Sequence, residues 1–153
     1  MNKYWTKDIY DELEKVNDFE HLFPIGLKVI KKMPQPISMV SGPISTGGKG
    51  SIEKNLKVFE RAIDLLSEKG HNVFHQLPFQ GVMIRLGTSW KGQGYCMPLL
   101  TEFYQPVFES GYIKTVHFIP GWEKSFGAKW EHEQCGRLGI ERIYLPEDFL
   151  SCL

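Results

Sequence analysis

The chain has 153 residues, of which 42% are hydrophobic and 24% are charged, a composition typical of one globular domain and not of a disordered segment. Eighteen lysines and arginines balance eighteen aspartates and glutamates, so the chain lacks the basic surplus that nucleic-acid binding usually needs. No apolar run approaches the roughly 18 residues of a membrane span, and residues 1–8 lack the apolar core of a signal peptide. We therefore expect no nucleic-acid partner, no membrane partner and a cytoplasmic location.

Residues 1–35 are predicted to form a helical N-terminal extension to the main domain. Thr6 can cap a helix that places Ile9, Leu13 and Val16 on one stripe. A second short segment over residues 25–32 ends before two prolines. The stripe has no evident partner inside the main domain, so we expect this extension to pack on the domain at an oligomer contact.

From residue 36 to residue 153 the sequence alternates between strand and helix. Strands are predicted at 37–40, 72–75, 113–119 and 140–145, and helices at 52–69, 97–110 and 125–138, with loops over 41–51 and 76–94. This order is typical of βαβ units, and it predicts an α/β domain whose parallel sheet of four or five strands has helices on both faces. Ligands bind such sheets at the carboxyl ends of the strands, which here means the segments 41–51 and 120–131.

The first of these segments is rich in glycine and precedes a helix. A phosphate-binding P-loop needs Lys directly after the last Gly of its motif, whereas Gly48 occupies that position and Gly50 follows Lys49. The P-loop interpretation therefore fails on spacing. The free backbone N–H groups at the helix start could still hold an anion, and a flexible connector is the alternative.

The second segment contains a carboxylate in a position suited to chemistry. Ser125 is a good N-cap, and Gly127 and Ala128 leave the backbone open to a ligand. Glu131 lies one turn further on the same face, where it is a candidate nucleophile or base. A glutamate placed there to interact with the helix dipole is the alternative. The histidines and cysteines do not form a metal-binding pattern, so we expect no metal.

The sequence resembles the nucleoside 2-deoxyribosyltransferase-like superfamily, which includes nucleoside 5′-monophosphate N-glycoside hydrolases and uncharacterised small bacterial and phage proteins. The resemblance covers roughly residues 36–148, and its most specific part is the motif GWxxSxGAxxE over residues 121–131. Weaker parts are the residues 40–45, the helix 52–69, Trp90 and Tyr95. The resemblance implies a flavodoxin-like fold and usually a homo-oligomer, a dimer or higher.

The resemblance also implies a reaction. Glu131 would attack the anomeric carbon of a nucleoside or nucleoside 5′-monophosphate, cleaving the N-glycosidic bond or transferring the sugar, as an N-glycoside hydrolase or a nucleoside deoxyribosyltransferase. No cofactor is needed. The expected small-molecule contacts are the loop 42–48, the motif and two tryptophans: Gly42, Pro43, Ile44, Ser45, Gly47, Gly48, Trp90, Trp122, Ser125 and Gly127.

One departure from the family pattern leaves an alternative open. Family members commonly carry an Asp or two between the middle helix and the motif strand, where it helps to protonate or hold the base. Here no Asp occurs between Asp64 and Asp148, and Glu102 and Glu109 are the carboxylates in that region. Either a Glu substitutes, or the chain is a nucleotide-binding or sensor relative without turnover.

Overall fold

A computed structural model of the chain describes residues 3–44, 48 and 50–152, and side chains as far as residue 149. The described part contains six α-helices, a π-helical segment and three strands. In chain order these are α1 (Lys7–Glu14), α2 (Leu22–Lys32), β1 (Ile37–Ser41), α3 (Ile52–Glu68), α4 (Gln80–Ser89), the π-helical segment Leu100–Tyr104, α5 (Gln105–Glu109), β2 (Ile113–Phe118), α6 (Phe126–Leu138) and β3 (Glu141–Tyr144).

The three strands form a parallel sheet in the order β1-β2-β3. The prediction of four or five strands is wrong for the described residues, because the segment 72–75 contributes only a single bridge between Val73 and Ser38. Two backbone hydrogen bonds of 2.9 Å join Ser38 to Asn72 and Phe74. The chain then continues into a 3-10 helix at Leu77–Phe79. The sheet still fits a flavodoxin-like arrangement, with residue 73 beside the outer edge of β1.

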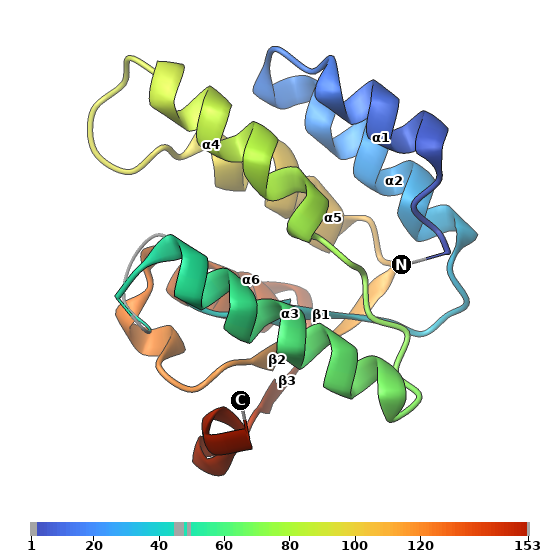
Figure 1. Cartoon of the computed structure of the whole chain (residues 1–153), viewed down its shortest axis with the longest axis vertical. Coiled ribbons are helices and arrows are strands. Elements are labelled where there is room, and N and C mark those ends of the chain that lie inside the picture. The colour runs from blue at the N-terminus through green and yellow to red at the C-terminus, as the bar shows by residue number, and fades with distance from the viewer. Residues whose placement is uncertain (1–2, 45–47, 49, 153) are drawn as a thin grey trace.

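The sheet separates two clusters of buried side chains. Helix α3 covers one face, where Phe59, Ala62 and Ile63 pack against Val40 of β1. The other face carries the larger cluster, to which the remaining helices contribute. The expected α/β layering with helices on both faces is therefore confirmed, and Figure 1 shows α3 below the group formed by α1, α2 and α4.

The N-terminal helices form part of the larger cluster. Ile9, Leu13 and Val16 are between 3% and 5% exposed, because they pack into the same core as Met39 of β1. The indole nitrogen of Trp5 donates a 2.8 Å hydrogen bond to the main-chain carbonyl of His75. Arg85 of α4 donates one of 2.8 Å to the Val16 carbonyl. Figure 1 shows α1 and α2 side by side next to α4. The premise that the stripe lacks a partner within the chain is wrong.

Helix α4 lies within the segment 76–94, which the sequence predicted to be a loop. Two glycines, Gly81 and Gly87, weaken its helical pattern, but Val82, Met83 and Leu86 bury one face against the core. Tertiary packing thus outweighs local propensity here. The predicted helix over 97–110 is divided into the π-helical segment and α5. Pro106 lies in the first turn of α5, where its missing N–H is tolerated.

Candidate functional site

A cavity of about 370 Å³ opens at the carboxyl end of β1, between α4, the π-helical segment and the start of α6. Its size is within the range of small-molecule sites. Its inner wall is formed by buried polar side chains, and large apolar side chains surround its outer part. It is lined by Gly42, Ile44, Ile52, Gln80, Met83, Ile84, Gly87, Thr88, Tyr95, Cys96, Leu99, Leu100, Tyr104, Ser125, Gly127, Ala128 and Glu131.

Glu131 places a buried carboxylate in this cavity. It lies in the second turn of α6 and is 6% exposed. The hydroxyl of Ser41, the last residue of β1, donates a 3.2 Å hydrogen bond to its Oε1, whereas its Oε2 has no partner among the described residues. Burial raises the pKa of Glu131 to about 8, and the Ser41 hydrogen bond opposes that rise. The carboxylate is therefore hydrogen-bonded at one oxygen and unpaired at the other.

The start of α6 leaves backbone accessible beside Glu131. The Ser125 hydroxyl accepts a 3.2 Å hydrogen bond from the Ala128 N–H, which confirms the predicted N-cap. Gly127 and Ala128 line the same cavity one turn before Glu131, as their spacing predicted. Gly42, the residue after β1, lines this cavity too, and it has no room for a side chain because an added Cβ would lie 2.8 Å from Ile119.

Two tyrosines contribute phenol groups to the cavity. Burial raises the pKa of Tyr95 to about 12, with a further contribution from the Glu131 charge, and its ring stacks on Phe126 at 4.4 Å. Tyr104 is 6% exposed, and burial also raises its pKa. Its oxygen accepts hydrogen bonds of 3.4 Å from the side-chain amides of Gln76 and Gln80. Both phenols therefore stay protonated at neutral pH.

The structure brings together four of the ten residues predicted to bind the substrate. Gly42, Ile44, Ser125 and Gly127 line the cavity with Glu131. Ser45 and Gly47 lie outside the described residues.

The remaining predicted residues lie elsewhere. Pro43 and Gly48 line a neighbouring cavity of about 410 Å³, on the side of α3. Trp122 lines a third cavity and stacks on His132, with ring centroids 4.2 Å apart. Trp90 follows α4 and is not among the residues that line the Glu131 cavity. The structure thus separates the two tryptophans from the carboxylate.

Sequence reasoning missed the side chains that α4 and the π-helical segment bring to the cavity. Gln80 and Met83 were assigned to a loop, and Tyr104 carried no motif. Ser41 was recognised only as part of a loop, although it pairs with a residue 90 positions later. The one available signal was a run of polar and aromatic residues between two apolar helices, which does not by itself identify a site.

Neither carboxylate suggested as a substitute for the missing Asp reaches this cavity. Glu102 is exposed, and Glu109 accepts a 2.9 Å hydrogen bond from Arg137 at the surface. Among the described residues that line the cavity, Glu131 is the only one with a carboxylate.

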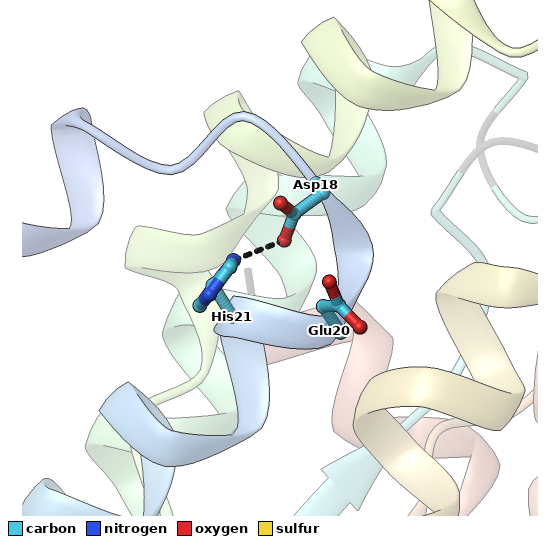
Figure 2. Close-up of side chains that lie close together, drawn as sticks. All are labelled: Asp18, Glu20 and His21. Atoms are coloured by element: carbon cyan, nitrogen blue, oxygen red, sulfur yellow. Dashed lines mark hydrogen bonds and ion pairs between the residues drawn. The ribbon is translucent and has the colours of Figure 1, made fainter.

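One other group of ligand-type side chains occurs within the described ranges. Asp18, Glu20 and His21 lie together at the turn before α2, where His21 Nδ1 contacts the Asp18 carboxylate (Figure 2). The group is mostly exposed and does not line the Glu131 cavity. The pairing of His21 with Asp18 accounts for it, and we assign no metal there.

Comparison with known proteins gives one match. The sequence profile of a family described as "Domain of unknown function (DUF4406)" matches residues 37–144, a span that runs from β1 to β3 and includes Glu131. Helices α1 and α2 precede the matched span. No curated protein and no solved structure shows significant similarity to the chain. No helix of the described part is long and apolar enough to cross a membrane.

Proposed function

Since the chain belongs to the DUF4406 family, whose description leaves the function open, we propose a function from the site itself: cleavage or transfer at the N-glycosidic bond of a nucleoside or nucleoside 5′-monophosphate, with Glu131 as the nucleophile. The resemblance of residues 121–131 to the nucleoside 2-deoxyribosyltransferase-like superfamily supports this proposal. The chemistry requires no cofactor or metal.

The observation that carries the proposal is the buried Oε2 of Glu131, which has no hydrogen-bond partner among the described residues. A carboxylate that is 6% exposed and has an unpaired, buried oxygen is costly unless a ligand or a proton pairs with that oxygen. An interaction with the helix dipole does not explain the burial of this carboxylate, because a glutamate with that role would lie in the first turn and could remain in solvent. Glu131 lies beyond the first turn and points inward.

The proposed reaction proceeds in two displacements, as in retaining glycosidases. Glu131 Oε2 forms a bond to C1′ of the sugar while the bond from C1′ to the base nitrogen breaks. The electron pair of that bond leaves with the base, which takes up a proton from solvent. Water or a second base then attacks C1′, the ester bond to Glu131 breaks, and the carboxylate is restored. The released sugar or new nucleoside keeps the original configuration at C1′.

The surrounding groups have distinct roles in this proposal. The Ser41 hydroxyl fixes the orientation of the carboxylate through Oε1. The first turn of α6, with Ser125 and Gly127, holds a sugar hydroxyl or phosphate against its open backbone. The base extends toward the outer part of the cavity, where Ile52 and Ile84 are 39% and 46% exposed. Trp122, which the sequence predicted as a substrate contact, has no role in this arrangement because it lines another cavity.

A second candidate is a nucleotide-binding protein without turnover. It is favoured by the observation that Glu131 is the only carboxylate in the described lining of the cavity. No second acid is therefore at hand to protonate the departing base, and the reaction would depend on solvent or on bases that leave readily. The two candidates share the site and differ only in whether the glycosidic bond breaks.

The experiment that separates them is incubation of the protein with a panel of ribonucleosides, 2′-deoxyribonucleosides and their 5′-monophosphates, scored by chromatography for free base. Addition of a second base in parallel reactions detects transfer. Release of base above the rate in protein-free samples supports the enzyme. Saturable binding without release supports the second candidate, and neither binding nor release contradicts both.

A further inference from the structure

Exposed apolar side chains gather around the outer part of the Glu131 cavity. Four large hydrophobic side chains are exposed among the described residues, and two of them, Ile52 at 39% and Ile84 at 46%, line this cavity. A third, Phe126, is 44% exposed and stacks on Tyr95 of the cavity lining, with ring centroids 4.4 Å apart. The fourth lies at another cavity. Ile52, Ile84 and Phe126 thus form an apolar rim to the Glu131 cavity.

The apolar rim does not contribute to the core of the domain. Its three residues come from different helices, Ile52 from α3, Ile84 from α4 and Phe126 from α6. None of the three is packed in or against either cluster of buried side chains. Single exposed apolar side chains are common on protein surfaces, whereas a group of them at one cavity is typical of a binding surface. Folding alone therefore does not account for the rim.

The lining of the cavity changes in polarity from its inner wall to the rim. Gln80, Ser125 and Glu131 are between 5% and 7% exposed and place polar groups on the inner wall. Ile52 and Ile84 are exposed in the outer part of the same cavity. A ligand pocket binds a molecule whose polar and apolar parts match those of its lining. A ligand that fills this cavity is therefore polar at its inner end and apolar at its outer end.

The side chains near the rim offer few hydrogen bonds to the polar edge of an unsubstituted base. The Thr88 hydroxyl donates its proton to the Ile84 carbonyl at 2.8 Å. Burial raises the pKa of Cys96, so it stays a thiol, which is a weak donor. The Tyr95 hydroxyl lies at the start of α6, 3.1 Å from where a Cβ on Gly127 would be. An alkyl group projecting from the base toward the rim needs no such partner, and it covers apolar surface that water would otherwise contact.

We propose that the substrate is a nucleoside or nucleotide whose base carries an uncharged apolar substituent, and that the apolar rim binds this substituent. The inference rests on the proposed function and names its substrate class. A second copy of the chain is the competing occupant of the rim. Ile52 and Ile84 line one cavity together with Glu131, so a single small molecule contacts both the rim and the carboxylate. A protein surface would cover the rim from outside without filling the cavity.

The test uses two series of nucleosides that differ only in the length of an alkyl chain on the base. One series is adenosine with its N6-methyl, N6-propyl and N6-pentyl derivatives, and the other is uridine with its 5-methyl, 5-propyl and 5-pentyl derivatives. The measured quantities are kcat/KM for base release and affinity by calorimetry. The proteins are the wild type, Ile52→Ser, Ile84→Ser and Tyr144→Ser. Tyr144→Ser is the matched control, because Tyr144 is 53% exposed and lines another cavity.

We expect kcat/KM and affinity of the wild type to rise with chain length in at least one series, by up to about fourfold for each methylene group that becomes buried. Ile52→Ser or Ile84→Ser should make this rise less steep, because the alkyl chain then contacts a smaller apolar surface. Tyr144→Ser should keep the wild-type rise. Values that stay level or fall with chain length in both series overturn the inference. A rise that neither isoleucine variant reduces also overturns it.

The inference and the proposed function fail separately. If the parent nucleosides lose their bases as fast as the alkylated ones, the inference fails and the proposed function stands. If no nucleoside loses its base, the proposed function fails, and the affinities of the same two series decide the role of the rim. A wild-type oligomer that Ile84→Ser dissociates in analytical ultracentrifugation would make the rim a subunit contact and overturn the inference. Circular dichroism and thermal melting show that each variant compared is folded.

Discussion

The hydroxyl of Ser41 donates a 3.2 Å hydrogen bond to Oε1 of Glu131, and this contact joins the end of β1 to the second turn of α6. It is the only hydrogen bond to the carboxylate within the described part of the chain, because Oε2 is unpartnered. A single neutral donor is insufficient to offset burial, and the pKa of Glu131 is accordingly raised to about 8. The contact orients the carboxylate while leaving its charge poorly compensated.

The raised pKa predicts how the activity depends on pH. A nucleophilic carboxylate must be deprotonated, so kcat/KM for base release should increase with pH up to about 8 and level off above it. Below that value the rate should fall about tenfold per pH unit, since the reactive form decreases by that factor. A pH–rate profile on one nucleoside measures this. A profile that is flat from pH 5 to pH 9 would contradict the assignment.

Ser41→Ala should move the midpoint of that profile to higher pH. The Ser41 hydrogen bond lowers the pKa of Glu131, so its removal leaves burial less opposed. Ser38→Ala is the matched control, because Ser38 is a buried serine of the same strand whose hydroxyl has no partner among the described residues. Its midpoint should equal that of the wild type. A downward shift in Ser41→Ala would show that the contact does not stabilise the carboxylate.

Glu131→Gln should change how protein stability depends on pH. The ordinary pKa of a Glu is 4.5 and the folded value is about 8, so between these values the folded chain holds a proton that the unfolded chain has released. This contribution to the free energy of unfolding is full below pH 4.5 and is lost as the pH rises toward 8, with a slope of about 1.4 kcal/mol per pH unit. Gln does not titrate, so the free energy of unfolding of Glu131→Gln does not fall with pH in this way. Urea unfolding at several pH values should show Glu131→Gln gaining on the wild type from pH 5 to pH 8, and parallel curves would refute the burial effect.

Ser125→Ala should affect both stability and binding. Its hydroxyl accepts from the Ala128 N–H as a helix cap, so its loss costs about 1 kcal/mol of folding stability. If the same hydroxyl also contacts the sugar or phosphate, the affinity falls by about 1–3 kcal/mol, more for a 5′-monophosphate than for its nucleoside if the contact is to phosphate.

Ser51→Ala provides the control for capping alone. The Ser51 hydroxyl accepts a 3.2 Å hydrogen bond from the Lys54 N–H at the start of α3, and Ser51 does not line the cavity. Thermal melting should show a similar loss of stability for both variants, while calorimetry should show weaker binding only for Ser125→Ala. Equal affinities in the two variants would remove Ser125 from the binding site.

Leu13→Ala tests whether the N-terminal helices are part of the fold. Leu13 is 3% exposed and packs in the main cluster, so truncation should lower the free energy of unfolding by about 2–5 kcal/mol. The loss of stability caused by Leu13→Ala should not depend on protein concentration, because the contact lies within one chain. A melting temperature that depends on concentration in the wild type but not in Leu13→Ala would show that this stripe forms the oligomer contact that the sequence predicted.

The sequence was sufficient for the elements whose signals are local. Ser125 caps its helix as predicted, and Gly139 ends α6 in the left-handed conformation that glycine favours. Glu131, Gly127 and Ala128 share a cavity because helical spacing alone places them on one face. These features depend on a few neighbouring residues, which is why they can be read from one sequence.

The features that the sequence did not predict depend on contacts between distant segments. Helix α4 is stabilised by burial of Met83 and Leu86 more than by its glycine-containing sequence. Ser41 and Glu131 are 90 residues apart, and the Gln76 and Gln80 contacts with Tyr104 need the π-helical segment in place. For Trp122 the sequence predicted a substrate contact that the structure does not contain. An aromatic side chain near a motif in the sequence need not face the cavity that the motif lines.

The most direct test of the account is the rate of base release by Glu131→Gln on the nucleoside that the wild type cleaves best. Gln keeps the shape of the side chain and removes the attacking charge, so the account predicts a fall of several orders of magnitude in kcat, with affinity for the nucleoside little changed and the protein folded. Turnover at the wild-type rate in Glu131→Gln would contradict the account, because the bond would then be broken without this carboxylate.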